Sequence, residues 1–479
     1  MADGPVPSPG RLPEPGFQLA VADRPHGTSY SLVAGRTALP AECVLERREP
    51  LPDGGVRLSY RHPDTGLAIG ILWERTPGTV VFRQSVQVRN DGSRDVTLTH
   101  VSSLFLPGIG TGDAAGPASA ESLRPWSHPG RFRLHYCLQC GQGENQWREA
   151  GLEDLGLMPT CVHGTPGAIQ FVSVGSRSTG RHVPMLVLED RDAGESWFLQ
   201  FETSGSWFLE IGNLGPGLSD RGALFLHASA AAERQLGFCR TLAPGESFRT
   251  PPCAAGRCPG GFEEAVRELD RHRRRISARL PDGRPFPIVF NDFMNCLWAE
   301  PTLSSLLPLL SRAADAGCDV FCMDAGWFHP AGADLNDHLG DWVPAESRYT
   351  PLGFRGLLDR IREAGLVPGL WLELEVCGFR SRIARTLPEA AFLHRNGVRI
   401  RDNPRQFLDL AHPEVRSHLL ETVDRLVGMG IGYIKNDFNG CVSLGDNNRP
   451  GRSPAAGLLE QTDALQDLVR DIRARHPGL

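Results

Sequence analysis

The C-terminal part of the chain repeats one pattern, strand then loop then helix, and this repetition limits the folds that it can adopt. Four apolar strand-like segments follow Pro285, and each precedes a segment with helical periodicity. The strand segments are 288–291, 320–324, 367–375 and 432–437, and the helical segments are 303–316, 354–364, 413–428 and 458–475. Strands that alternate with helices form βαβ units around a parallel sheet. The sequence therefore predicts an α/β fold of the (β/α)8-barrel type here, with only about the first four βα units present.

The N-terminal part follows a different pattern, with short alternating runs and turns rich in Gly, Asp, Asn and Pro. The runs 79–88 and 96–99, for example, flank the turn Asn90-Asp91-Gly92-Ser93. Regular short strands separated by turn signals predict a large all-β sandwich domain. We therefore expect a β-sandwich over 1–261, a linker helix over 262–285 and the first half of a barrel over 286–479.

Charge and composition exclude several classes of protein. The 50 basic and 56 acidic residues give a formal net charge of −6, so neither nucleic acid nor an anionic membrane is an expected partner. The basic stretch 267–279 has no interleaved aromatic residues and is interpreted as solvated helix surface. No apolar run approaches the roughly 20 residues that span a bilayer. The N-terminus does not resemble a secretory signal, and the 12 cysteines are spread thinly, so we expect a cytoplasmic protein with free thiols.

Sequence motifs for metals and cofactors are missing. The chain has no GxxxxGK[ST], GxGxxG or HExxH motif, and the pair Cys137 and Cys140 lacks the second pair of ligands that zinc normally takes. No cofactor and no metal are therefore expected, and the chemistry falls to carboxylates.

Acidic residues stand at the ends of strand segments, which form the active-site face of a (β/α)8 barrel. Lys435, Asp437 and Asn439 share one face of the fourth segment if the strand extends that far. An ammonium beside a carboxylate favours the ionised form that a nucleophile requires. The alternative for Asp437 is a strand-end residue that caps the next turn.

Two further segments place acids beside tryptophans. Asp324 precedes Trp327, an arrangement typical of sugar binding, although a loop acid and a core tryptophan would give the same pattern. In the third strand segment, period two places Trp371, Glu373 and Glu375 on one face. Unpaired buried carboxylates are costly, which favours a functional role for both glutamates.

The alternative for these glutamates is a structural ion pair, for instance with Arg405.

Six motifs follow one another in the second part of the chain: Phe290-Asn291, Asp324-Ala325-Gly326-Trp327, Gly340-Asp341-Trp342, Pro368-Gly369-Leu370-Trp371-Leu372-Glu373, Arg405-Gln406-Phe407-Leu408-Asp409 and Tyr433-Ile434-Lys435-Asn436-Asp437. Taken together, they resemble the motifs of glycoside hydrolase family 36, the α-galactosidase family of the melibiase clan. The resemblance covers roughly 287–479 in order and spacing, and the N-terminal part matches the family's β-supersandwich in architecture only.

The resemblance implies a retaining α-glycosidase that removes terminal α-linked galactose from oligosaccharides through a covalent glycosyl-enzyme on Asp437. The substrate-binding residues that we expect are Asp324, Trp327, Trp371, Glu373, Arg405, Lys435 and Asn439. Many relatives carry a second Asp where this chain has Ala325, which keeps an α-N-acetylgalactosaminidase-like activity open.

The second catalytic group is expected outside this sequence. In the family the general acid/base lies on a later barrel strand, and a retaining glycosidase needs both carboxyl groups. We therefore expect a chain that is truncated within the barrel and that lacks its acid/base. The rival hypothesis is a non-catalytic carbohydrate-binding or inert fragment. An oligosaccharide is the expected partner in the first case, and a homo-oligomer is also open.

Overall fold

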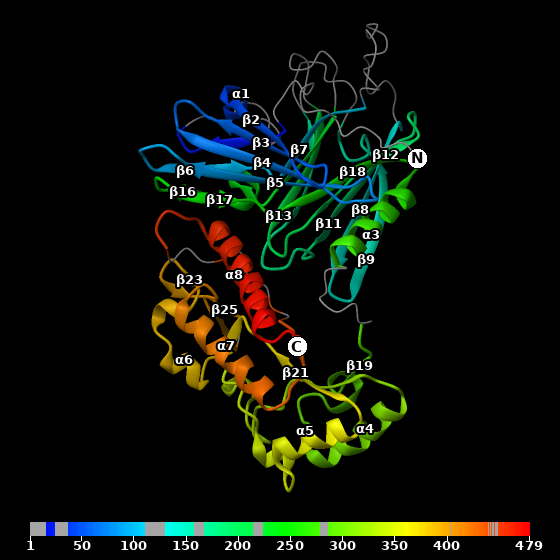
Figure 1. The fold of residues 1–479 in the computed structure, drawn as a ribbon, viewed down its shortest axis with the longest axis vertical. Helices are drawn as coiled ribbons and strands as arrows, with labels where there is room; N and C mark the ends of the chain where they lie inside the picture. Colours follow the sequence, from blue (N-terminus) through cyan, green and yellow to red (C-terminus); the bar gives the residue numbers. More distant parts are fainter. Residues whose placement is uncertain are drawn as a thin grey trace. The chain divides into compact units, whose positions relative to one another are not determined.

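The computed structural model describes residues 16–23, 37–110, 130–157, 167–213, 224–277, 286–402, 404–438, 440, 442, 445 and 449–479. The chain divides into two compact units, one of Met1–Arg279 with Arg449–Leu459 and one of Leu280–Asn448 with Glu460–Leu479. Figure 1 shows the elements of each unit. Within the described ranges, every helix is too short or too polar to cross a membrane.

The first unit consists almost entirely of antiparallel strands. They are β1 (Leu19–Val21), β2 (Val44–Pro50), β3 (Val56–Arg61), β4 (Leu67–Arg75), β5 (Phe82–Asn90), β6 (Val96–Val101), β7 (Leu104–Ile109), β8 (Phe132–Cys140), β9 (Gly143–Gly151), β10 (Ala168–Ser173), β11 (His182–Asp190), β12 (Glu195–Phe201), β13 (Trp207–Asn213), β14 (Leu224–Ser229), β15 (Ala231–Ala232), β16 (Arg240–Leu242), β17 (Ser247–Arg249) and β18 (Cys253–Pro259). Two short helices, α1 (Leu39–Glu42) and α2 (Glu233–Leu236), accompany them.

These strands form three sheets. The largest has the order β2-β3-β4-β5-β18-β12-β11-β8-β9, with β17 beside β5, and the others are β10-β13-β14-β7 and β1-β6-β15, with β16 beside β6. On β4, Leu67, Ile69, Ile71 and Trp73 point into the core, as the alternation of apolar residues requires. The prediction of a β-rich N-terminal part is confirmed.

The helix that the sequence predicts as a linker belongs to the first unit. It is α3 (Phe262–Ser277), and it lies against β11, β12 and β18. Its buried residues Ala265 and Leu269 share a hydrophobic cluster with Val187 and Phe198. This apolar face covers the sheet, so α3 is part of the β-rich unit rather than a separate connection. Residues 278–285 of the expected linker lie outside the described ranges.

The second unit contains the predicted strand–helix pattern. A parallel sheet has the order β19-β20-β21-β27, formed by Val289–Asn291, Val320–Met323, Val367–Leu372 and Tyr433–Asn436. The long helices are α4 (Leu303–Asp315), α5 (Gly353–Glu363), α7 (Pro413–Gly428) and α8 (Pro454–Arg475). Helix α8 is divided, because its residues up to Leu459 belong to the first unit and the rest belong to the second. The α/β prediction is confirmed, while closure into a barrel stays a prediction.

Shorter elements fill the loops that follow these strands. They are one-turn helices at Phe293–Leu297, Leu335–Asp337, Glu346–Tyr349 and Glu389–Ala391, the helix α6 (Arg382–Thr386), and the strands β22 (Val376–Gly378), β23 (His394–Arg395), β24 (Val398–Arg399), β25 (Arg401–Asp402) and β26 (Arg405–Phe407). Because β22 pairs with β26, the chain after β21 leaves the parallel sheet, and Arg405 enters the region of the strand ends.

The fold generates one prediction, which concerns the attachment of α3. His272 Nδ1 lies 2.8 Å from Thr76 Oγ1, and His272 Nε2 lies 2.9 Å from Glu202 Oε1. Arg83 Nη2 donates to the second oxygen of Glu202 at 2.6 Å. Burial alone would raise the pKa of Glu202, but the hydrogen bonds from His272 and Arg83 outweigh it and lower the pKa. This stabilisation is therefore present above the unfolded pKa and is lost as the pH falls through the lower folded value.

We expect Glu202→Gln to lower the protection of the α3 amides against hydrogen exchange at pH 7 by about 1–3 kcal/mol. The difference from the parent protein should shrink below about pH 4. Glu74→Gln is the matched control, because Glu74 contacts the same Arg83 at 3.4 Å with a side chain that is 39% exposed. Equal effects of the two substitutions at pH 7 would contradict this assignment.

Candidate active site

The carboxyl ends of the four parallel strands bring polar side chains together. Asn291 ends β19, Asp324 follows β20, Trp371 lies in β21, and Lys435 and Asp437 lie at the end of β27. Trp371 is directly opposite Lys435 in the parallel register. Because parallel strands end at the same edge of a sheet, residues far apart in sequence meet there.

Lys435 connects two carboxylates at this edge. Its Nζ lies 2.9 Å from Asp324 Oδ2 and 3.1 Å from Asp437 Oδ2. Partial burial would lower the pKa of Lys435, but its hydrogen bonds to the two aspartates outweigh burial and raise it. The ammonium therefore keeps its charge, as the predicted pairing of Lys435 with Asp437 requires.

Each aspartate has a second donor on the oxygen that faces Lys435. Asn291 Nδ2 donates to Asp324 Oδ2 at 2.6 Å, and Trp371 Nε1 donates to Asp437 Oδ2 at 3.3 Å. The Asp324 side chain is 4% exposed, whereas that of Asp437 is 30% exposed. The side-chain donors described for Asp437 both bind Oδ2, which leaves Oδ1 available to a substrate.

Asp292 is a buried acid of the site that our sequence reasoning missed. The Asp324 amide donates to Asp292 Oδ1 at 2.8 Å, so Asp292 fixes the backbone that carries Asp324. Burial raises the pKa of Asp292 to about 7, with the charge of Asp324 adding to the shift and the Asp324 amide opposing it. The signal was available, because Asp292 directly follows the strand end at Asn291.

Glu373 lies within ion-pair distance of Arg405, the partner named in the structural alternative. Its Oε2 lies 3.2 Å from Arg405 Nε, although the N–H is not aligned for a hydrogen bond. Burial raises the pKa of Glu373 to about 8; Arg405 opposes the shift, while Glu375 and Asp437 add to it. Burial also raises the pKa of Glu375. Both glutamates follow the end of β21 at Leu372, so the alternation expected over 367–375 stops before them.

The substrate-binding role predicted for Trp327 stays a prediction, and in this structure its side chain is fully buried. Its ring stacks on Trp342 at 6.3 Å and on Phe354 at 5.9 Å between ring centroids. Its Nε1 donates to the carbonyl of Trp371 at 2.9 Å. Trp327 is therefore a core residue in this structure, as in the alternative interpretation, and it supports the end of β21.

The remaining predicted residues divide in two. Trp371 and Arg405 lie at the site, while Asn439 lies outside the described ranges. Across the described residues, no group of three or more His, Cys, Asp and Glu side chains could hold a metal ion. The site can thus offer one accessible carboxylate, two cations and an indole N–H, a set suited to binding hydroxyl groups and attacking an electrophilic carbon.

Comparison with known proteins shows which families resemble this chain. Residues 247–479 match the family model described as Melibiase. The α-galactosidase AgaA of Geobacillus stearothermophilus is 26% identical over 297 residues, which cover 60% of this chain and 39% of that protein. A probable α-galactosidase C of Aspergillus flavus is 24% identical over 459 residues, which cover 93% of this chain and 56% of that protein. The chain thus spans less than two thirds of the length of these relatives.

Solved structures extend the likeness to the fold. The crystal structure of the GH36 α-galactosidase AgaA superimposes with a TM-score of 0.74 at 19% identity, covering 97% of this chain and 61% of that one. A variant of the same enzyme in complex with raffinose gives a TM-score of 0.72 at 18% identity, covering 97% of this chain and 58% of that one. Residues 247–479 are thus similar to melibiases, the chain is similar to α-galactosidases, and it shares the fold of GH36 α-galactosidases.

Proposed function

We propose that this chain carries the nucleophile half of a retaining α-glycosidase site that hydrolyses terminal α-linked galactose from oligosaccharides. The observation that carries the proposal is the bridge of Lys435 between Asp324 and Asp437 at the carboxyl ends of parallel strands. The names of the relatives, which are α-galactosidases, and the raffinose and stachyose complexes of AgaA variants support the choice of substrate class.

In this proposal Asp437 is the nucleophile. Its free Oδ1 forms a bond to the anomeric carbon while the bond from that carbon to the leaving oxygen breaks, and an acid group protonates the leaving oxygen. Water then attacks the same carbon while its proton passes to the base that the acid group has become; the bond to Oδ1 breaks, which releases galactose and restores the carboxylate. Lys435 and the Trp371 indole hold Oδ2, so the attacking oxygen is oriented before the sugar arrives.

Asp324, Lys435 and Arg405 bind the sugar in the same proposal. Asp324 accepts hydrogen bonds from sugar hydroxyls, and the guanidinium of Arg405 donates to them. We further infer that β19, β20, β21 and β27 are the first four strands of a (β/α)8 barrel that follows a β-sandwich domain.

A trapping experiment tests the nucleophile. Fluoride leaves without protonation, so 5-fluoro-α-galactosyl fluoride examines attack by the carboxylate independently of an acid/base. We expect mass spectrometry of the digested protein to find one 5-fluorogalactosyl group on the peptide that contains Asp437, and none in Asp437→Asn. Label on Glu373 or Glu375 instead would move the nucleophile to the third strand. A chain that releases no fluoride and takes no label is the outcome expected of a non-catalytic fragment.

The stereochemistry gives a second test of the same residue. Asp437→Gly leaves space on the β-face of the anomeric carbon, which azide can enter. With an α-galactosyl donor bearing a good leaving group, we expect β-galactosyl azide, because one inversion replaces two. Removal of Glu373 should not create this rescue, and azide rescue confined to that variant would contradict the assignment.

The role of Lys435 can be separated from that of the nucleophile. Lys435→Met removes the cation between two carboxylates, so we expect labelling by the same reagent to slow roughly 10²–10³-fold at neutral pH. Lys435→Arg keeps the charge and should retain most of the labelling rate. An unchanged labelling rate in Lys435→Met would contradict this role of Lys435.

The protonation of Glu373 is also testable. Because its folded pKa of about 8 lies above its unfolded value, its contribution to stability is complete at low pH and is lost as the pH rises toward about 8. We expect Glu373→Gln to remove this pH dependence, so the parent should lose roughly 2–4 kcal/mol more protection of the β21 amides between pH 5 and pH 8 than the variant. Glu363→Gln, an exposed change on α5, is the control. Equal pH dependence in the parent and Glu373→Gln would show that Glu373 is ionised in the folded protein.

A further inference from the structure

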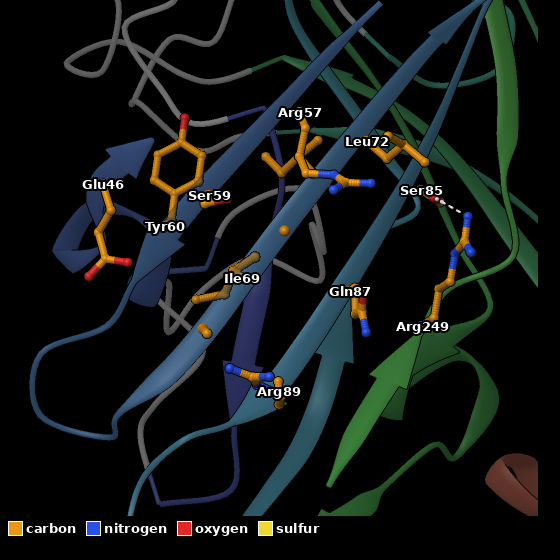
Figure 2. A pocket seen from close by; sticks show the side chains of 13 residues that line it. Glu46, Arg57, Ser59, Tyr60, Ile69, Leu72, Ser85, Gln87, Arg89 and Arg249 are labelled. Atoms are coloured by element: carbon orange, nitrogen blue, oxygen red, sulfur yellow. Dashed lines mark hydrogen bonds between the residues drawn. The ribbon is translucent and has the colours of Figure 1, made fainter. Parts of the chain in front are cut away.

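A polar hollow lies on the first unit, on the outward face of the sheet region formed by β3, β4, β5 and β17. Its volume is about 330 Å³, and Figure 2 shows side chains that line it. The inward face of β4 carries the core residues, so its outward residues Ala68, Gly70 and Leu72 form the floor. A β-carbon at Gly70 would meet no heavy atom within 4 Å, which shows open space above the strand.

Longer side chains stand on both sides of this floor. In the antiparallel register, Ser59 of β3 and Gln87 of β5 flank Gly70, while Arg57 and Ser85 flank Leu72. The hollow is therefore a short trough, with small residues below and hydrogen-bonding groups along its walls. Its apolar floor distinguishes it from an evenly charged surface.

Two guanidinium groups at the trough have no carboxylate partner among the described residues. Figure 2 shows Arg57 extended across the sheet toward Ser85, whose hydroxyl lies 3.3 Å from Arg249 Nη2. Neighbouring arginines are neutralised, since Arg61 pairs with Glu46 at 2.7 Å and Arg89 pairs with Asp91 at 2.6 Å. Arg57 and Arg249 form no such pair, so their charges are available to an anion that enters between them.

We propose that this trough binds a carboxylated sugar, a uronate residue of an oligosaccharide. The carboxylate pairs with Arg57 and Arg249, the ring hydroxyls bond to Ser59 and Gln87, and the C–H face of the ring rests on Gly70 and its neighbours. The volume lies at the lower end of the ~300–1,000 Å³ range of small-ligand sites, which suits one or two rings. Inorganic phosphate would satisfy the guanidinium groups but would leave the floor unused.

This inference is independent of the activity proposed for Asp437, because it rests on residues of the first unit alone. The test is a calorimetric titration of the full chain with digalacturonate, with neutral α-1,4-galactobiose and inorganic phosphate titrated separately. We expect digalacturonate to bind, and binding to weaken at least tenfold in the double variant Arg57→Gln with Arg249→Gln. Raised salt should weaken binding as well, because the contact is ionic and partly exposed.

Further variants separate the floor from the charges. Gly70→Val fills the trough with a residue that strands favour, so digalacturonate should lose affinity while the sheet stays folded. Arg47→Gln is the matched control, since Arg47 on β2 is exposed, is paired with Glu49 and lies outside the trough. Its affinity should equal that of the parent.

Several results would overturn the proposal. They are equal binding of the neutral disaccharide, binding of phosphate as tight as that of digalacturonate, and an unchanged affinity in Gly70→Val. A change of oligomeric state in the arginine double variant, with no uronate binding by the parent, would instead make this face a contact between copies of the chain. Circular dichroism of each variant checks that a loss of binding is not a loss of folding.

Discussion

The pairing of the Lys435 ammonium with two carboxylates is the interaction on which the site depends. It lies between two carboxylates that come from different strands, and the same oxygen of each aspartate faces it. Two carboxylates that contact the same ammonium repel each other by on the order of a few kcal/mol when solvent screening is incomplete. The Lys435 cation between them offsets this repulsion and also fixes both side chains. The same contact therefore balances the charge of the site and sets its geometry.

The position of that ammonium depends in turn on the packing beneath it. Trp371 and Lys435 are neighbours in the parallel register, and the buried Trp327 donates to the carbonyl of Trp371. Trp371 also stacks on Phe328, with 6.1 Å between ring centroids and 4° between planes. A close-packed aromatic layer allows few ring orientations. The indole N–H of Trp371 is thus directed at Asp437 by the core rather than by the site itself.

Local periodicity predicted the elements of the second unit well, because strands and helices there bury one face each. The strands β19, β20 and β27 and the helices α4, α5 and α7 lie within a residue or two of the predicted segments. The same reasoning failed where a strand ends. Side chains alternate between the two faces of a sheet only while the backbone is paired with a neighbouring strand. The pairing of β21 with β27 ends at Leu372 and Asn436.

The burial of Trp327 also has a local physical origin. Gly326 adopts a φ of +111°, and a side chain at this position would collide with the carbonyl of Ala299. This backbone conformation reverses the direction of the chain after Asp324, so the acid faces the site while the tryptophan enters the core. The short distance between Asp324 and Trp327 in the sequence does not predict this reversal, although the sequence does place Gly326 between them.

The buried acids explain why the accessible negative charge of the site is concentrated at Asp437. Burial raises the pKa values of Asp292, Glu373 and Glu375, which favours their protonated forms. Lys435 pairs with the carboxylates of Asp324 and Asp437, whereas Arg405 lies beside Glu373. Asp324 is enclosed, so the more accessible of the two carboxylates is the one proposed to attack the sugar. Because burial disfavours ionisation of Asp292, Glu373 and Glu375, and Asp324 is enclosed, the site can hold several carboxyl groups while Asp437 remains its most accessible carboxylate.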